Sequence, residues 1–278
     1  MKLGKFTLIS LSDGTFWLDG GAMFGVVPKV IWEKLNPADE LNRIELGLNP
    51  LLIQTGEKNI LIDTGIGDKF DEKFKKIFRV DKSQHLLNSL GNIGLKPEDI
   101  DIVINTHLHF DHCGGNTCVK EGKIVPTFPN AKYVIQKGEW ENAINPNERT
   151  RASYLKENFV PIEEAGQLEL IEGDVEILPG IQVYVTGGHT KSHQVVFIEA
   201  GDKKAVYLGD LIPTASHIKL PYIMGYDLYP IETLEKKREL LPKAISENWL
   251  LVFEHDPKIT MGYLEEKEGK FLVKPIQE

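Results

Sequence analysis

The hydrophobic positions of the chain fall in many short runs rather than in long periodic stretches. Short, mostly apolar runs bounded by polar or glycine-containing turns are typical of β-strands. They predict strands at 6–10, 51–54, 59–62, 102–105, 133–136, 182–185, 195–198, 205–208 and 250–253. The polar segment around Gly56, between the second and third of these runs, predicts a β-hairpin.

Helical patterns lie between the strands. Leu86, Leu87 and Leu90 share one face of a helix predicted at about 84–90. A second helix is predicted from Ile231 to about Leu241, where Pro242 should end or kink it, and 95–99 is predicted to form a turn or short capped helix. Strands followed by single helices, and a second strand-rich half from about residue 168, suggest a layered α/β/β/α sandwich.

Composition narrows the class of protein. The 278 residues are 41% hydrophobic and lack a linker-like stretch, so a single domain over 1–278 is expected. The net charge of −9 argues against a nucleic-acid partner, which would favour clustered Lys and Arg. No stretch approaches the roughly 20 apolar residues of a membrane span, and the start does not resemble a secretory leader, so the prediction is a cytoplasmic protein without a membrane partner.

The candidate chemistry begins in the run from Thr106 to Gly115. His107, His109, Asp111 and His112 fall within six positions there, directly after the apolar run Ile102-Val103-Ile104. Imidazole nitrogens and carboxylate oxygens are good ligands for zinc and its divalent neighbours. One tight turn with four such groups can serve two metal ions, each needing further ligands from elsewhere.

Three other segments offer those ligands. His189, Asp210 and His255 each follow a predicted strand closely, where rigid elements aim side chains into a shared cleft. A lone histidine at such a place is more often structural. The repetition of the same character at several strand ends favours a metal site.

With these motifs, the chain resembles the metallo-β-lactamase superfamily, which implies an αββα four-layer sandwich. By that resemblance His107, His109 and His189 would hold one metal ion, while Asp111, His112 and His255 would hold the second and Asp210 would bridge them. Asp63 matches an early aspartate that orients ligands, and His193 matches a histidine often found behind the site.

The resemblance implies metal-assisted hydrolysis. Two divalent ions, expected to be zinc with Mn, Fe or Co as alternatives, would share a bridging hydroxide that attacks an acyl carbon or a phosphorus. Asp111 would bind one metal through one oxygen and steer the water with the other, as a catalytic residue. The chain has no GxSxG nucleophile motif, and it has no room for the flavodoxin domain of the redox branch of the superfamily.

Within the superfamily the His run looks most like the N-acyl-homoserine lactonases, which act in quorum quenching, and their methyl-parathion-hydrolase-like relatives. The segment 19–29 is similar to a loop over the active site of those lactonases, so Met23 and Phe24 are expected to contact an acyl chain, although core packing explains them equally well. Many lactonases carry a tyrosine three residues after the bridging aspartate, where this chain has Pro213. His217 is the first candidate to replace it, as a proton donor, followed by the loop tyrosines Tyr222, an expected substrate contact, and Tyr226.

The leading hypothesis is therefore a dinuclear-metal lactonase or esterase with a small-molecule lactone or ester substrate. A phosphotriesterase or phosphodiesterase is the second hypothesis, since the same hydroxide can attack phosphorus. A non-catalytic metal-binding protein is less favoured because every ligand position is filled. A homodimer is expected from the resemblance alone.

Overall fold

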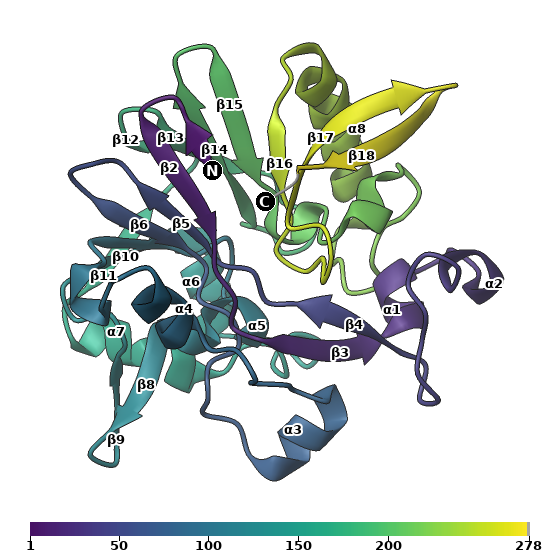
Figure 1. The fold of residues 1–278 in the computed structure, drawn as a ribbon. Helices are drawn as coiled ribbons and strands as arrows, with labels where there is room; N and C mark the ends of the chain where they lie inside the picture. The colour runs from purple at the N-terminus through teal and green to yellow at the C-terminus, as the bar shows by residue number, and fades with distance from the viewer. Residues whose placement is uncertain (277–278) are drawn as a thin grey trace.

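The computed structural model describes residues 1–276, and within them the chain forms two seven-stranded β-sheets that face each other (Figure 1). The last two residues of the predicted 1–278 domain lie outside this description. The strands of the first sheet follow the order β1 (Lys2–Leu3), β2 (Phe6–Ser10), β5 (Leu51–Gln54), β6 (Asn59–Ile62), β7 (Ile102–Ile104), β10 (Lys132–Gln136) and β11 (Leu168–Ile171). The strands of the second follow the order β12 (Val175–Leu178), β13 (Ile181–Val185), β14 (Gln194–Ala200), β15 (Lys203–Tyr207), β16 (Leu250–Val252), β17 (Met261–Lys267) and β18 (Lys270–Pro275).

All strands predicted from the sequence are present, with ends within two residues of the predicted ones. The predicted hairpin is the antiparallel pair β5–β6, in which Leu51 lies opposite Ile62. From β6 onward the first sheet is parallel through β7, β10 and β11. Parallel neighbours need crossover connections, and the helices between residues 72 and 164 lie in those crossovers.

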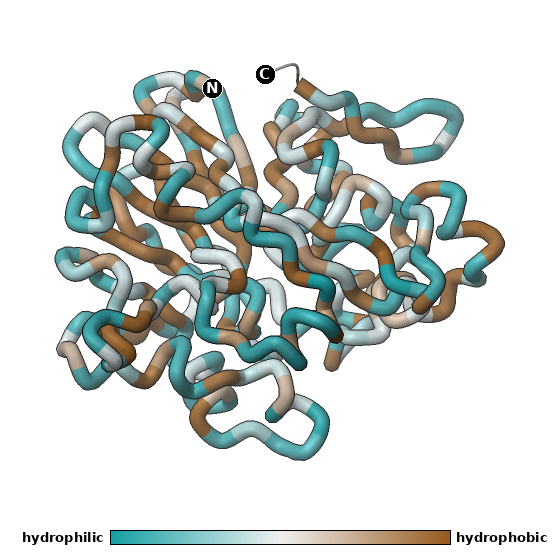
Figure 2. The backbone as a smooth tube through the Cα atoms, turned by 60° about the horizontal axis from the view of Figure 1, so that its bottom comes forward, coloured by the Kyte–Doolittle hydropathy of each residue, from teal (hydrophilic) through white to brown (hydrophobic). Residues whose placement is uncertain are grey.

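Adjacent residues of the strands face different layers. In β5, Leu51 and Ile53 belong to the core between the two sheets, whereas Leu52 belongs to the cluster beneath the outer helices. Helices α4 (Leu86–Asn92), α6 (Lys137–Ile144) and α7 (Val160–Glu164) cover the first sheet, and α8 (Pro230–Ser246) covers the second. The predicted αββα four-layer sandwich is confirmed, and the hydrophobic segments gather within its layers (Figure 2).

Helix α8 corrects one expectation from the sequence. The helix continues through Pro242 to Ser246 instead of ending at Leu241. A proline removes the hydrogen bond to the carbonyl four residues earlier, here that of Arg238. Arg238 and Pro242 both lie on the exposed side, where solvent can satisfy that carbonyl, while Leu240, Leu241 and Ala244 hold the other side against the sheet.

Residues 15–47 form a projection from the sandwich that we call the arm (Figure 1). It consists of the hairpin β3 (Thr15–Asp19) and β4 (Arg43–Gly47), with α1 (Gly20–Phe24) and α2 (Lys29–Trp32) between the two strands. Phe16, Trp32 and Ile44 form its buried cluster, which continues to Phe110 in the sandwich. The predicted loop 19–29 therefore contains α1 and ends at the first residue of α2.

Other short elements connect strands of the first sheet. They are α3 (Glu72–Phe78), α5 (Phe110–Cys113) and the hairpin of β8 (Thr117–Lys120) and β9 (Lys123–Pro126). Among the helices of residues 1–276, none combines the length and the apolar character needed to cross a membrane.

Candidate metal centre

The His-rich run forms the loop after β7 and the short helix α5, which begins at Phe110 with His109 as the preceding N-cap residue. The two glycines that follow let this loop lie against residues 64–66. A Cβ atom on Gly114 would lie 2.0 Å from the carbonyl oxygen of Ile66, and one on Gly115 would lie 2.3 Å from that of Thr64. The glycine pair is therefore required for the close approach that holds the loop in place.

The structure brings the predicted ligands together at the ends of four strands. His189 follows β13, Asp210 follows β15 and His255 follows β16, and all three meet the loop after β7. Their donor atoms form two groups, each within 4.8 Å: His107, His109, His189 and Asp210 in one, and Asp111, His112 and His255 in the other. The six other residues are grouped as the resemblance implied, and Asp210, the expected bridge, belongs by this distance to the first group.

Asp210 faces both groups with different oxygens. Its Oδ2 lies 3.0 Å from His189 Nε2 and 3.8 Å from His107 Nε2. Its Oδ1 lies 3.4 Å from His112 Nε2 and 3.3 Å from His255 Nε2. A carboxylate in this position can be shared between two cations.

The outer hydrogen bonds of the histidines determine which ring nitrogen faces inward with a lone pair. The outer nitrogens of three rings lie close to oxygen acceptors: His112 Nδ1 to Asp63 Oδ2 (3.0 Å), His189 Nδ1 to Asp227 Oδ1 (2.9 Å) and His255 Nδ1 to the Gly47 carbonyl (2.9 Å). In the neutral form of each ring the outer nitrogen donates its hydrogen, which leaves Nε2 with a lone pair that a metal ion can accept. His112 Nε2 and His255 Nε2 are only 3.0 Å apart. Two lone pairs at this distance repel unless a cation lies beside them.

Unpartnered polar atoms at the centre support the same conclusion. His107 Nε2 and Asp210 Oδ1 are buried without a hydrogen-bond partner among the described residues. Buried polar atoms are rarely left in this state, because the cost of removing them from water is then uncompensated. An all-nitrogen and oxygen donor set fits Zn, and also Mn, Fe and Co. The residues present therefore fit two divalent cations.

The electrostatics of the site favour added positive charge. Burial, followed by the neighbouring His112 ring, holds the pKa of His107 well below its usual range, so this ring is neutral. Burial alone would also lower the pKa of His189, but the carboxylates of Asp210 and Asp227 raise it to about 10. A divalent cation between Asp210 and the rings would supply the positive charge that these carboxylates attract.

Asp63 and His193 lie directly behind the ligands. Asp63 has a left-handed backbone with φ of 54°, and its carboxylate accepts from both the amide and the hydroxyl of Thr106 as well as from His112. His193 Nε2 accepts a hydrogen bond of 3.0 Å from the Asp210 amide. His193 Nδ1 lies 2.7 Å from the hydroxyl of Thr186. These contacts orient His112 and Asp210 respectively.

Sequence reasoning missed two buried carboxylates next to the ligands. Asp227, from the loop before α8, holds His189 and also accepts from the Thr233 hydroxyl at 2.7 Å. Glu139, in α6, accepts from the Leu108 amide, the Tyr154 hydroxyl and the Thr190 hydroxyl. Burial raises the pKa of Glu139. Neither residue belongs to a recognisable motif, because their partners are distant in sequence.

A cavity of about 450 Å³ opens onto both donor groups. His109, Asp111, His189, Asp210 and His255 form its polar floor. Its apolar wall consists of Leu18, Ala22, Met23, Phe78, Phe110, Met224 and Leu228. Arg149 and Tyr226 add polar groups from two loops.

Three of the expected substrate contacts are not in this cavity, although Met23 is. Phe24 and Tyr222 are buried behind the wall, with their rings in an edge contact at 6.0 Å. His217 is 1% exposed, and its two ring nitrogens lie within 2.8 Å of the Thr214 hydroxyl and the Met23 carbonyl. The prediction of His217 as a proton donor to substrate is therefore wrong, because both nitrogens are already engaged inside the protein. Of the three candidates to replace the expected tyrosine, Tyr226 lines the cavity.

Several known proteins are similar to this chain in fold and sequence. The sequence profile of the metallo-beta-lactamase superfamily matches residues 44–255. A Bacillus cereus protein named N-acyl homoserine lactonase is 31% identical over 232 residues, which cover 77% of this chain and 83% of that protein. The structure of a probable metal-dependent hydrolase from Staphylococcus aureus has a TM-score of 0.91 at 36% identity over all of both chains. An N-acyl homoserine lactone hydrolase with N-hexanoyl-L-homoserine bound at its catalytic metal center has a TM-score of 0.68 at 26% identity, covering 93% of this chain and 95% of that one.

Proposed function

Since the chain belongs to the metallo-beta-lactamase superfamily and is a metal-dependent hydrolase, we propose that it opens the lactone ring of N-acyl-homoserine lactones. The observation that carries this proposal is the cavity in which both donor groups face an apolar wall. Such a substrate has a polar ring that is hydrolysed and an acyl chain that needs apolar surface. The similarity to proteins named N-acyl homoserine lactonase supports the same substrate class.

The proposed cofactors are two zinc ions, held by the two donor groups with Asp210 shared between them. When bound, such ions would supply an activated water and would polarise the carbonyl group whose carbon is attacked. The protein keeps the donor atoms in place through the outer partners Asp63, Asp227 and the Gly47 carbonyl.

Asp111 is the proposed catalytic carboxylate. Its Oδ2 lies 3.6 Å from His255 Nε2 and 3.9 Å from His112 Nε2, within the second donor group. Its other oxygen, Oδ1, would accept the proton of the attacking water and later return it to the leaving alkoxide. Asp111 lines the cavity, so substrate can reach it.

Tyr226 takes the role expected of a donor at the position of Pro213. Burial raises the pKa of Tyr226 to about 12, so its hydroxyl keeps its proton at neutral pH and can donate to the lactone carbonyl. The backbone carbonyl of Pro213 accepts a hydrogen bond of 3.0 Å from the His255 amide. Arg149 braces the loop of Tyr226 through a 3.1 Å hydrogen bond to the Gly225 carbonyl.

The test is a substrate panel with the zinc-loaded protein: N-acyl-homoserine lactones, simple γ-lactones and aryl phosphotriesters. We expect hydrolysis of the acyl-homoserine lactones and its loss in Asp111→Asn, with Asp202→Asn, on an exposed turn, as the matched control. Turnover of phosphotriesters without turnover of any lactone would contradict the proposal.

A further inference from the structure

The apolar wall of the cavity is supplied partly by the arm, whose helix α1 carries Ala22 and Met23. The backbone of this helix is bonded to the loop 214–226 of the sandwich. His217 Nε2 lies 2.8 Å from the Met23 carbonyl, and the Gly225 amide donates to the Ala22 carbonyl at 2.7 Å. A Cβ atom on Gly25 would lie 2.5 Å from the Ile223 carbonyl, so the two segments are in close contact.

As a neutral ring, His217 can make this hydrogen bond in only one tautomer. The Met23 carbonyl is an acceptor, so His217 Nε2 must carry the hydrogen, and Nδ1 must then accept from the Thr214 hydroxyl at 2.7 Å. The ring also stacks on Phe24, with centroids 4.5 Å apart and planes 12° apart. Phe24 stacks in turn on Trp32 of α2 at 5.3 Å. The His217 ring therefore holds the arm in two ways, through the hydrogen bond from Nε2 to the Met23 carbonyl and through stacking on Phe24.

The turn that contains His217 is held in turn by hydrogen bonds from helix α8. Lys237 in α8 is fully buried, and its Nζ donates to the carbonyls of His217 (2.6 Å), Lys219 (2.7 Å) and Tyr222 (2.9 Å). Three carbonyl acceptors match the three hydrogens of an ammonium group. Burying a lysine costs free energy unless its ammonium group is hydrogen-bonded. Here these three hydrogen bonds hold a segment whose regular structure is one short helical turn.

From these contacts we infer that His217 and Lys237 are positioning residues that set the depth of the acyl-chain wall, and so the preference of the enzyme for acyl-chain length. The inference rests on the proposed function for its substrate class. Lys237 holds the turn, His217 holds α1 to that turn, and α1 places Met23 against the substrate. Neither residue touches the donor groups or the substrate itself.

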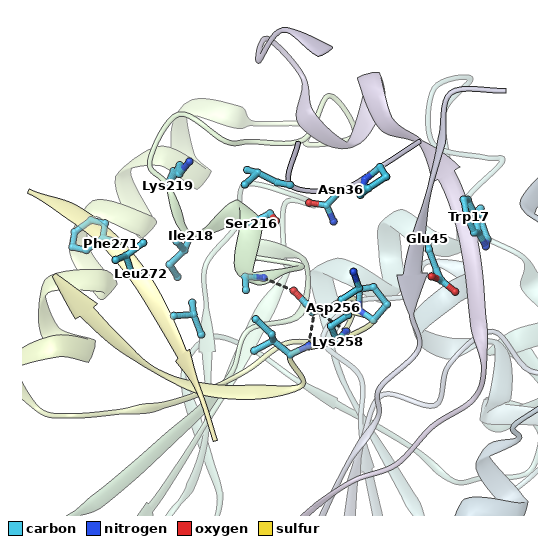
Figure 3. A pocket seen from close by; sticks show the side chains of 16 residues that line it. Trp17, Asn36, Glu45, Ser216, Ile218, Lys219, Asp256, Lys258, Phe271 and Leu272 are labelled. Carbon is cyan, nitrogen blue, oxygen red and sulfur yellow. Dashed lines mark hydrogen bonds between the residues drawn. The ribbon is translucent and has the colours of Figure 1, made fainter. Parts of the chain in front are cut away.

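The same turn offers a matched control. Ser216, Ile218 and Lys219 line a different cavity, of about 470 Å³, together with Trp17 and Leu272 (Figure 3). This second cavity lies on the other side of β3, because Trp17 faces it while the next residue, Leu18, lines the cavity of the metal centre. A change at Ser216 therefore alters the same turn without removing the bond to the arm.

The test compares kcat/KM for N-decanoyl- and N-butanoyl-homoserine lactone in wild type, His217→Phe, His217→Ala, His217→Gln and Ser216→Ala. His217→Phe keeps a ring against Phe24 but lacks the donor, whereas His217→Gln can still donate to the Met23 carbonyl. We expect the decanoyl-to-butanoyl ratio to fall about tenfold in His217→Phe and His217→Ala, chiefly through KM for the longer substrate. The ratio should stay within about threefold of wild type in His217→Gln and Ser216→Ala.

An unchanged ratio in His217→Phe and His217→Ala, or an equal loss for both lactones, would overturn the inference. A second measurement is independent of any substrate: amide hydrogen exchange of residues 20–27 should be faster in His217→Phe than in wild type or Ser216→Ala, and equal exchange would contradict the inference. If the wild type hydrolyses neither lactone, the proposed function fails. The hydrogen-exchange measurement alone then tests whether His217 holds the arm in place. The His217 variants are preferred to Lys237→Met, because loss of the buried amine leaves three carbonyls without their donor and endangers folding.

Discussion

The metal centre and the arm meet in one cavity but are built in different ways. The donor side chains sit at the ends of strands in two large sheets, are mostly buried, and are oriented by outer hydrogen bonds to carboxylates or carbonyls. The arm consists of a hairpin and two short helices, with side chains such as Val26 (90%) and Val30 (73%) exposed, and it is joined to the sandwich through backbone carbonyls. If the proposed function holds, the reaction depends on the strand-end site and the chain-length preference depends on the arm, so substitutions should affect the two separately.

The largest effect is expected from the shared ligand. Asp210→Asn removes the charge that faces both donor groups, so kcat/KM for every lactone should fall by more than the roughly hundredfold loss typical of outer partners. Steady-state kinetics with short and long acyl chains measure this loss. If the loss depended strongly on chain length, the separation between reaction and selectivity would be broken.

A smaller loss of activity is expected from substitution of Asp227, which supports the ligand His189. Asp227→Ala leaves His189 Nδ1 without its acceptor, so activity or metal affinity should fall about 10- to 100-fold while the chain-length preference remains. Kinetics and a competition assay for the metal would measure the two effects. Wild-type values for both would show that Asp227 does not orient His189.

Tyr226 lines the cavity together with residues of the metal centre and of the arm, so its substitution tests whether it acts in the reaction or in substrate binding. Tyr226→Phe removes one neutral donor from the cavity, so kcat should fall about tenfold with little change in KM. Kinetics on one acyl-homoserine lactone suffice to separate the two constants. A rise in KM alone would move Tyr226 from the reaction to substrate binding.

The smallest effect concerns the stability of the arm contact. Burial lowers the pKa of His217 to about 3 from 6.5; the Met23 carbonyl and Asp210 oppose this shift, while Lys237 and His255 add to it. Well between these values the unfolded chain binds one more proton than the folded chain. This contribution is therefore intact above pH 6.5 and is lost as the pH falls below it, with a slope that approaches about 1.4 kcal/mol per pH unit. Denaturant unfolding should show that wild type loses about 1 kcal/mol more stability than His217→Gln between about pH 6.5 and 5.5. Identical losses would contradict the assignment of a neutral, buried ring.

The features that the sequence could predict are those governed by local pattern. The strands were predictable because adjacent positions such as Leu51 and Leu52 face different apolar layers, and the donor set was predictable because the spacing of His107, His109 and Asp111 is specific. Asp227 and Glu139 could not be found this way, because their roles depend on partners 38 and up to 51 residues away.

The errors concern side-chain direction in irregular segments. No periodicity determines whether His217 or Tyr222 faces the cavity, and the structure turns both inward against Phe24. Helix α8 continues past Pro242 because its other face is packed, which is a tertiary effect. A cytoplasmic location and a homodimer stay predictions.

The central claim is a site for two metal ions that share Asp210, and metal content tests it most directly. Chelator-treated protein is reconstituted with zinc, freed of excess metal and analysed for zinc per chain, alongside Asp210→Asn and Asp202→Asn. We expect two zinc ions per chain in wild type and in Asp202→Asn, and fewer in Asp210→Asn. One ion or none in the wild-type protein, or two retained in Asp210→Asn, would contradict a two-metal site shared through Asp210.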